Sequence, residues 1–255
     1  LIAERFADHP GMLRPKALSA TAEDAGALWR WARRECLPHF GPYEDAMSRH
    51  SSGLFHTRLS PLMNIHRLLP REVVEDALAE PLPLASKEGF LRQVLGWREY
   101  VRHVHVETDG FRRLPGGDPP VAAEAGDAGF ARWAGAAWKG TGPLAGVDGG
   151  AEPSALGASR PLPPAFWGAE SGLACLDQVV ADVWREGWSH HITRLMVLSN
   201  LATLLDLSAR ELTDWFWVAY IDAFDWVVEP NVLGMGTYAL GDLMTTKPYV
   251  SGAAY

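Results

Sequence analysis

The sequence predicts an all-α fold, and three observations lead to this prediction. Apolar residues recur at three- and four-residue spacing along much of the chain, which is the period of an amphipathic helix. Segments of alternating apolar and polar residues, which indicate strands, are nearly absent. The 255 residues are 47% hydrophobic and 21% charged, and this composition is sufficient to bury a full core.

Helix-start signals divide the first hundred residues. Thr21 is placed to cap a helix that begins at Ala22, and Pro38 is expected to stop this helix. Pro70 occupies the first position of a second helix, where its missing N–H costs nothing. Ser86 is expected to open a third helix, which continues through Trp97.

The middle of the chain has a different composition. Residues 108–165 are rich in Gly, Ala and Pro, and they predict a long irregular region with one short helix near Gly129–Trp138. Helical patterns return over residues 172–187, 189–205 and 208–222. The middle region is therefore expected to be an excursion within one helical domain.

The last of these helical patterns begins with a capping signal. Ser208 is followed three residues later by Glu211, which is the spacing of a capping box. Residues 229–255 then predict a glycine-rich loop with short helical pieces. No internal repeat is visible, and at 255 residues one or two domains are possible.

Composition narrows the classes of function. The net charge is −8, from 23 basic and 31 acidic residues, so any contact with nucleic acid must come from local basic patches. No run of about 18 uncharged apolar residues is present, and no membrane span is expected. Cys36 and Cys175 are far apart and are not a disulfide framework, which fits a reducing, cytoplasmic location. The 11 Trp residues indicate large helical packing surfaces.

Ionisable side chains occur on two apolar helical segments in the second half of the chain. His190, His191 and Arg194 fall within one segment, and Asp222 ends the next. Because ionisable groups rarely enter a core unpaired, Arg194 and Asp222 are expected to form a buried pair. This pair can bind a polar ligand or be a simple interhelical ion pair. The adjacent His side chains point about 100° apart on a helix and cannot chelate one metal ion.

Hydroxyl groups and a guanidinium precede a helix that starts with proline. Thr57, Arg58 and Ser60 supply donors, and a helix N-terminus adds free N–H groups, a combination that can bind a pyrophosphate. Ordinary N-capping by Ser60 ahead of Pro61 is the simpler explanation on these residues alone.

A third motif, Arg-Gln-Val-Leu-Gly-Trp-Arg-Glu-Tyr, covers residues 92–100. Trp97 and Tyr100 are three residues apart and share one face of a helix. As a bare pattern, the segment is an amphipathic helix with Arg98 and Glu99 in solvent.

Together these motifs resemble the photolyase/cryptochrome family, in its bacterial branch that also carries an iron–sulfur cluster. Residues 57–61 are similar to the family's phosphate-binding loop, and residues 96–102 are similar to its flavin-lining helix. The segment around Tyr43 and the run 247–255 look like the same bacterial branch. The resemblance covers nearly the whole chain, is weakest across residues 108–165, and implies the family's helical FAD-binding domain over residues 1–255.

The resemblance implies that the chain binds FAD. Arg194 and Asp222 match the pair that clasps the isoalloxazine, and Asp225 and Asn231 are further matches. The Asp-x-x-Asp spacing departs by one residue from the commoner Asp-Gly-Asp. The matches to the family's other cofactor contacts are Tyr43, His56, Thr57, Arg58, Leu59, Ser60, Gln93 and Arg98.

The resemblance also implies residues that act on the substrate. His191, the second His of the pair with His190, matches the proton donor of (6-4) photolyases. Leu195 replaces the further His that usually follows four residues later. Trp97 and Tyr249 are implied to border the cavity for the DNA lesion.

Three aromatic positions match the family's electron route. Trp215 and Trp167 lie where the bacterial branch has aromatic residues that pass electrons to the flavin. Phe216 stands where some relatives have Tyr. Without the resemblance, each of these residues is expected to be part of the core.

Cys175 matches the first of four ligands of a four-iron–four-sulfur cluster, and the other three are expected to follow Tyr255 in a longer parent. The chain lacks a starting Met, and we expect it to be a fragment without the family's N-terminal α/β antenna domain. A cluster normally needs four thiolates, so these residues alone are not expected to bind one.

The implied function is light-driven repair of UV-induced pyrimidine lesions in DNA, most closely (6-4) photoproducts, by electron transfer from reduced FAD. The implied protein is a monomeric DNA photolyase-like lyase. A cryptochrome-type blue-light sensor with the same flavin pocket is the first alternative. A cofactor-free helical interaction module, and a fragment that does not fold alone, are the others.

Overall fold

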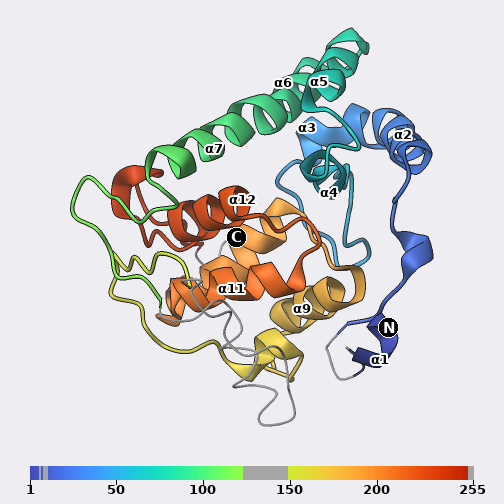
Figure 1. The fold of residues 1–255 in the computed structure, drawn as a ribbon. Coiled ribbons are helices and arrows are strands. Elements are labelled where there is room, and N and C mark those ends of the chain that lie inside the picture. The colour runs from blue at the N-terminus through green and yellow to red at the C-terminus, as the bar shows by residue number, and fades with distance from the viewer. Residues whose placement is uncertain (6, 8–10, 123–148, 252–255) are drawn as a thin grey trace. The chain divides into compact units, whose positions relative to one another are not determined.

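The computed structural model describes residues 1–5, 7, 11–122 and 149–251 (Figure 1). Its regular structure is helical, and the described residues contain only two isolated β-bridges, Val121–Ala151 and Arg160–Leu207. The predicted all-α fold is confirmed. Among the described helices, none combines the length and apolar character that crossing a membrane requires. The predicted short helix at Gly129–Trp138 lies outside the described residues.

The chain divides into two compact units. The smaller unit is Met12–Tyr100, and the larger unit combines Leu1–Gly11 with Val101–Tyr255. The boundary falls within helix α7 (Arg98–Glu107).

The smaller unit is built from short helical segments. Thr21 caps the first long helix as predicted, because its hydroxyl accepts from Asp24 N at 3.1 Å and Thr21 N donates to the Asp24 carboxylate at 3.2 Å. Trp29 and Phe90 then stack in the core at 6.1 Å between ring centroids. The elements are η1 (Pro15–Ala17), α2 (Ala22–Trp31), η2 (Ala32–Cys36), η3 (Leu37–His39), α3 (Phe40–Tyr43), α4 (Ser60–Asn64), α5 (Pro70–Ala79), α6 (Leu84–Leu91) and η4 (Arg92–Trp97).

Two boundary predictions in this unit are wrong. Pro38 does not stop the helical path, because it occupies the first turn of η3, where a missing N–H is tolerated. Ser86 does not open its helix but lies inside α6, fully buried, where its hydroxyl accepts from Gly41 N at 2.9 Å. A Cβ at Gly41 would lie 2.7 Å from Ser86 N, so glycine permits this close packing of α3 and α6.

Two helix starts in this unit are close to their predicted positions. Pro70 begins α5, as predicted. Helix α4 begins at Ser60, one residue before the predicted first helical residue, Pro61. Leu59 is its N-cap residue and no side chain caps it, so the predicted N-capping by Ser60 is wrong.

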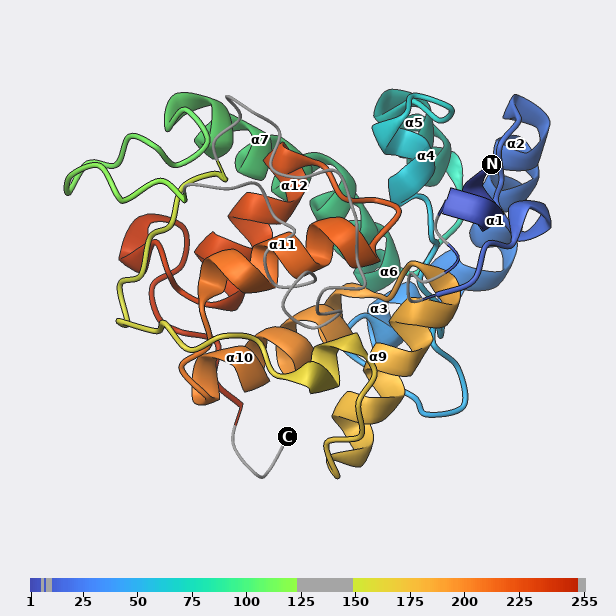
Figure 2. The same cartoon turned by 60° about the horizontal axis from the view of Figure 1, so that its bottom comes forward.

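The larger unit holds the more extensive core. Helices α11 and α12 lie side by side within it in Figure 1 and in Figure 2. Its largest fully buried side chain is Trp215, which packs with Phe166 and Leu212 in one cluster. The elements besides α7 are α1 (Ile2–Arg5), η6 (Pro164–Trp167), α9 (Ala174–Glu186), η7 (Thr193–Ser199), α10 (Asn200–Leu204), α11 (Ala209–Ala219), α12 (Asp225–Glu229), η8 (Pro230–Gly236) and η9 (Gly241–Leu243).

The predicted capping box of α11 is half correct. The Ser208 hydroxyl accepts from Glu211 N at 3.2 Å, as an N-cap does. The Glu211 side chain does not reach back to Ser208 N, which donates to Arg160 O at 2.7 Å. Instead, Glu211 accepts from Leu162 N at 2.9 Å. The glutamate therefore fastens the segment before η6 to α11.

Three of the π-helical segments carry residues that the sequence assigns to a site. Gln93 and Trp97 lie in η4, Arg194 lies in η7 and Asn231 lies in η8. A π-helical turn is wider than an α-helical turn and redirects the side chains around it, and such turns are frequent at functional sites. This feature has no evident signal in the sequence.

Candidate functional site

Arg194 and Asp222 form the buried ion pair that the sequence predicts. The Arg194 Nη2 atom is 2.9 Å from one carboxylate oxygen of Asp222 and 3.2 Å from the other. The side chain of Asp222 is 4% exposed and that of Arg194 is 22% exposed. The contact is therefore shielded on the Asp222 side, while part of the Arg194 side chain remains accessible to solvent.

The end of α9 fixes the turn that carries Asp222. Gly187 terminates this helix with φ +62°, in the left-handed region that favours glycine. Its carbonyl accepts a hydrogen bond from Ile221 N at 2.8 Å. A Cβ at position 187 would lie 2.9 Å from the Ile221 side chain, so only glycine allows this approach.

His190 and His191 lie just before η7, separated from it by Ile192. His190 is 2% exposed, and its carbonyl accepts from the Thr193 hydroxyl at 2.9 Å and from Arg194 N at 3.3 Å. His191 is half-buried. The two rings are 6.4 Å apart between centroids and inclined by 73°. His190 lies before the first helical residue, and ring nitrogens of the two residues lie within 4.8 Å of each other. The predicted divergence of two adjacent helical His side chains is therefore wrong.

The two predicted electron-route tryptophans lie in the core of the larger unit. Trp184, which the sequence analysis does not single out, contacts both of them. Its ring stacks on Trp167 at 5.7 Å and meets Trp215 edge to face at 6.0 Å. Trp184 and Trp215 both donate their indole N–H to Phe166 O, at 3.1 and 2.8 Å. The three indoles therefore form a continuous series.

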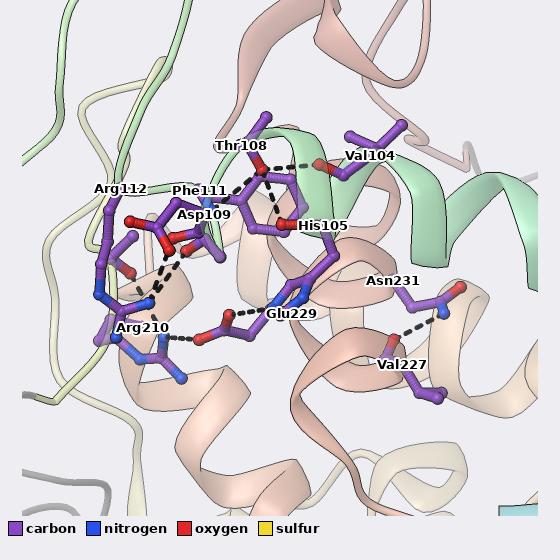
Figure 3. Close-up of polar contacts among 12 residues, drawn as sticks. Val104, His105, Thr108, Asp109, Phe111, Arg112, Arg210, Val227, Glu229 and Asn231 are labelled. Atoms are coloured by element: carbon purple, nitrogen blue, oxygen red, sulfur yellow. Dashed lines mark hydrogen bonds and ion pairs between the residues drawn. The ribbon is translucent and has the colours of Figure 1, made fainter.

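A second ion network, shown in Figure 3, joins α7, α11 and α12. Arg210 Nη1 is 2.8 Å from Glu229 Oε1, and His105 Nε2 is 3.0 Å from Glu229 Oε2. Arg210 also contacts Asp214 Oδ1 through Nε at 2.8 Å and Nη2 at 2.7 Å. Its Nη1 donates in addition to Ala151 O at 3.3 Å. Three groups thus contact the Arg210 guanidinium, and His105 contacts one of them.

Burial and charge affect the two carboxyl groups of this network differently. Burial raises the pKa of Asp214 to about 6, and the charge and hydrogen bond of Arg210 offset this only in part. Burial also acts to raise the pKa of Glu229, but the hydrogen bond with His105 and the charge of Arg210 outweigh it. The pKa of Glu229 is therefore below its usual value.

The further predicted residues of the larger unit lie after the ion pair in sequence. Asp225 is exposed in the first turn of α12, and Asn231 is half-buried in η8. The Asn231 side chain donates to Val227 O at 2.7 Å. Tyr249 is 41% exposed. The contacts of Asp225, Asn231 and Tyr249 with a ligand remain predictions.

In the smaller unit, the predicted phosphate loop has a specific backbone shape. Arg58 has φ +57°, and its Nη2 donates to the Ser52 hydroxyl at 3.1 Å. Leu59 is 1% exposed and anchors the loop in the core, while Thr57 and Ser60 are half-buried. The loop thus holds its polar side chains next to a buried apolar anchor.

His56 and Tyr43 flank this loop. The ring nitrogens of His56 lie 3.1 Å from Gly53 O and 3.1 Å from Glu44 O, and burial lowers the pKa of His56. These contacts tie two segments together through the imidazole. Tyr43 is 44% exposed, and its ring packs against Phe55 at 4.9 Å between centroids.

The helix motif of the smaller unit is held by polar contacts. Gln93 Nε2 donates to a Glu44 carboxylate oxygen at 2.8 Å, and Arg98 Nη1 donates to Asn64 Oδ1 at 3.2 Å. Burial lowers the pKa of Arg98. Trp97 is half-buried and stands 5.5 Å from Tyr100 between centroids. Arg98 is therefore partly withdrawn from solvent, unlike the bare amphipathic pattern.

Comparison with known proteins finds a relative that matches almost the entire chain. Over 254 residues, or 98% of the chain, the sequence is 29% identical to a (6-4) photolyase of Agrobacterium fabrum. The chain is therefore similar to a member of the photolyase/cryptochrome family along almost its whole length. It spans less than half of this relative, because the match covers 43% of the (6-4) photolyase.

A solved structure shares the fold of the chain, and a second relative matches a shorter segment. The fold matches the crystal structure of a bacterial class III photolyase from Agrobacterium tumefaciens with a TM-score of 0.61 and 16% identity, over 97% of this chain and 42% of that one. An uncharacterised protein of Acanthamoeba polyphaga mimivirus is 35% identical over 60 residues, or 24% of this chain and 49% of that protein. No protein-family model matches.

The structure adds residues that sequence reasoning missed. Trp184 could have been found from its place on the apolar face of α9, four residues after Val180. The Arg210 network could not have been found from the sequence, because its members His105 and Glu229 are 124 positions apart. Tyr220, which contacts Arg194, has no signal beyond its position next to the predicted pair.

The two cysteines have different surroundings. Cys175 is exposed in the first turn of α9. Cys36 is buried, and burial raises the pKa of its thiol to about 12. A thiol with so high a pKa is a poor metal ligand, because metals bind the thiolate.

Proposed function

We propose that this chain is the FAD-binding helical domain of a DNA photolyase that repairs UV-induced pyrimidine lesions, (6-4) photoproducts in particular. The observation that carries the proposal is the match of 98% of the chain to a (6-4) photolyase. The buried Arg194–Asp222 pair, at the positions that the family resemblance assigns to flavin contact, supports it.

The donors and acceptors of these residues fit a flavin. The pyrimidine ring of the isoalloxazine presents both carbonyl acceptors and a ring N–H donor. Arg194 supplies N–H donors and Asp222 supplies carboxylate acceptors from one fixed pair. In the smaller unit, Arg58 and Ser60 are the cation and hydroxyl that a diphosphate requires.

When bound, reduced FAD supplies light-driven electron donation to the lesion. The chain's own residues then have separate tasks. Arg194 and Asp222 orient the cofactor, and Trp97 and Tyr249 border the lesion. His191 holds a proton on its imidazole and delivers it to the photoproduct, which needs a group that titrates near neutral pH. Flipping a pyrimidine out of the duplex costs a few kcal/mol of free energy, and it costs less when the base is damaged.

The indole series supports a route by which electrons reach the site from outside. Trp167, Trp184 and Trp215 contact one another in order, at 5.7 and 6.0 Å between centroids. Phe216 stands where some relatives have Tyr, but a phenyl ring is harder to oxidise than a phenol or an indole. In this proposal, Trp184 therefore carries the electron in place of Phe216. An external thiol is the class of reductant that replenishes the series.

An iron–sulfur cluster would need more cysteine ligands than this chain supplies. Cys175 is exposed and is the candidate ligand, whereas Cys36 is buried with a raised pKa. Two cysteines in 255 residues do not make a four-thiolate set. We therefore derive no step through a cluster, and Cys175 remains a proposed ligand in a longer protein.

A blue-light sensor of the cryptochrome type is the second candidate function. The net charge of −8 favours it, because a domain that binds the DNA backbone usually presents excess Lys and Arg. Both candidates need the same flavin-binding residues. They differ in whether light removes a lesion from DNA.

The test is repair of DNA that carries a single (6-4) photoproduct, under blue light and in the dark, with FAD-loaded protein. We expect repair only in the light, and we expect His191→Ala to keep FAD but lose repair. His103→Ala, an exposed His on α7, is the matched control and is expected to repair normally. Photoreduction without repair by the wild type would favour the sensor, and full repair by His191→Ala would remove the assigned proton donor.

A further inference from the structure

Tyr220 lies directly beneath the guanidinium of Arg194. The Cζ atom of Arg194 is 4.1 Å from the centroid of the Tyr220 ring, within the range of a cation–π contact. Tyr220 is the C-cap residue of α11, with extended backbone angles, and is 5% exposed. Phe216 stacks on the same ring at 4.9 Å with an interplanar angle of 8°. The Tyr220 ring is therefore a rigid platform under the arginine.

The hydroxyl of Tyr220 connects this platform to a second support. Its oxygen is 2.8 Å from the Ser189 hydroxyl, and Ser189 is 3% exposed. The carbonyl of Ser189 accepts from Arg194 Nε at 2.8 Å. Burial raises the pKa of Tyr220, and the Arg194 charge offsets this only in part, so the phenol remains neutral. Ser189 and Tyr220 thus brace each other and the arginine.

These contacts account for most of the hydrogen-bonding capacity of Arg194. Its Nε is used by Ser189 and its Nη2 by Asp222. Its Nη1 makes no hydrogen bond with any residue in the described ranges, and the side chain is 22% exposed. An arginine fixed on three sides with one nitrogen available is preorganised to donate to a ligand.

We propose that Tyr220 is a positioning residue, which with Ser189 holds Arg194 in the one orientation that pairs with Asp222 and presents Nη1 to an acceptor group. This inference rests on the proposed function, in which the acceptor belongs to a flavin. Because the guanidinium is fixed before the ligand arrives, less side-chain freedom is lost on binding. Loss of Tyr220 should therefore weaken binding through Arg194 alone.

The first experiment needs no cofactor. In protein labelled with ¹⁵N-arginine, the Nε–H signal of Arg194, assigned by its loss in Arg194→Lys, should be shifted by the tyrosine ring. We expect Tyr220→Leu to move this signal toward the position of exposed arginines, and Tyr220→Phe to keep most of the shift. Phe166→Leu, which removes another fully buried ring of the same core, is the control and should leave the signal in place.

The second experiment measures the dissociation constant of FAD. We expect Tyr220→Leu to weaken binding about 3- to 30-fold, the range of a desolvated cation–π contact. Tyr220→Phe and Ser189→Ala should each weaken it about 2- to 10-fold, as loss of one buried hydrogen bond does. In an Arg194→Gln background, Tyr220→Leu should have no further effect, because its role acts through the arginine.

The outcomes separate this inference from the proposed function. An Arg194 signal that does not move in Tyr220→Leu overturns the inference, whether or not the wild type binds FAD. Losses of affinity that add fully in the double variant also overturn it. A wild type that does not bind FAD overturns the proposed function, and the Arg194 signal then decides on positioning by itself. A moved signal together with non-additive losses supports both.

Discussion

Two arginines of the larger unit each bind a buried carboxylate, but their surroundings differ. Arg210 contacts Glu229, Asp214 and Ala151 O, and its side chain is 4% exposed. Arg194 contacts Asp222 and Ser189 O above the Tyr220 ring, and its side chain is 22% exposed. The Arg210 guanidinium is enclosed by protein groups. Within the described residues, the Arg194 guanidinium still has one nitrogen, Nη1, that makes no hydrogen bond.

This difference teaches that a buried ion pair does not by itself indicate a ligand site. Breaking an enclosed pair leaves uncompensated charge in a medium of low dielectric, so its removal affects folding. A pair with an open donor can be changed at a smaller cost in stability and a larger cost in binding. The pair formed by Arg210 and Glu229 should therefore govern stability, and the pair formed by Arg194 and Asp222 should govern FAD binding.

The largest effect is expected for Arg210→Met. It leaves Glu229 and Asp214 without their countercharge, and the free energy of unfolding should fall by about 3–5 kcal/mol. Urea denaturation followed by circular dichroism measures this. Arg34→Met breaks the exposed pair with Glu35 and should change stability by about 1 kcal/mol or less. Equal effects of the two variants would break the comparison.

Asp222→Asn should act mainly on binding. It removes the charge that orients Arg194, and FAD affinity should fall about 10- to 100-fold, as loss of a charged hydrogen bond predicts. Fluorescence titration of FAD measures this. Asp242→Asn makes the same chemical change at an exposed position and should bind FAD like the wild type. Unchanged FAD affinity of Asp222→Asn would contradict the role of the Arg194–Asp222 pair.

The pH dependence of stability should report the Arg210 network. Burial raises the pKa of Asp214 from 3.8 to about 6, so the folded state favours its protonated form. The contribution of Asp214 to stability is therefore present at low pH and is lost as the pH rises from about 4 to about 6. Relative to Asp214→Asn, the wild type should lose about 2 kcal/mol over this interval. Urea denaturation at a series of pH values measures this. Parallel stability profiles of the wild type and Asp214→Asn would contradict the prediction.

The smallest effect is expected for His105→Gln. The glutamine amide can still donate to Glu229, so the free energy of unfolding should fall by only about 1 kcal/mol. His103→Gln, at an exposed position of the same helix, should have no measurable effect. A loss at His105 as large as that at Arg210 would show that the imidazole is the principal partner of Glu229.

The sequence predicts the helical fold and the main ion pair because both follow from local patterns. Apolar spacing and capping residues such as Thr21 and Pro70 act within one or two helical turns. Asp222 and Arg194 are predictable because charged residues interrupt apolar helices. Wrong boundaries arise where tertiary contacts use a side chain elsewhere, as Ser86 binds Gly41 N in place of capping α6.

The rest of the site depends on contacts distant in sequence. The Tyr220 platform becomes visible only when the end of α11 is placed beside Arg194. Likewise, Trp184 is one of 11 Trp residues until its ring is found between Trp167 and Trp215. The π-helical turns that carry Arg194 and Asn231 are also set by packing, since their sequences read as ordinary helix.

The most direct test of the account is the absorption spectrum of the protein purified in the dark and then incubated with excess FAD and desalted. We predict flavin bands that persist in the wild type and in Asp242→Asn, and that are reduced strongly in Asp222→Asn. The released chromophore should be FAD. A correctly folded wild type that retains no flavin would contradict the proposed function and favour a helical domain that binds no cofactor.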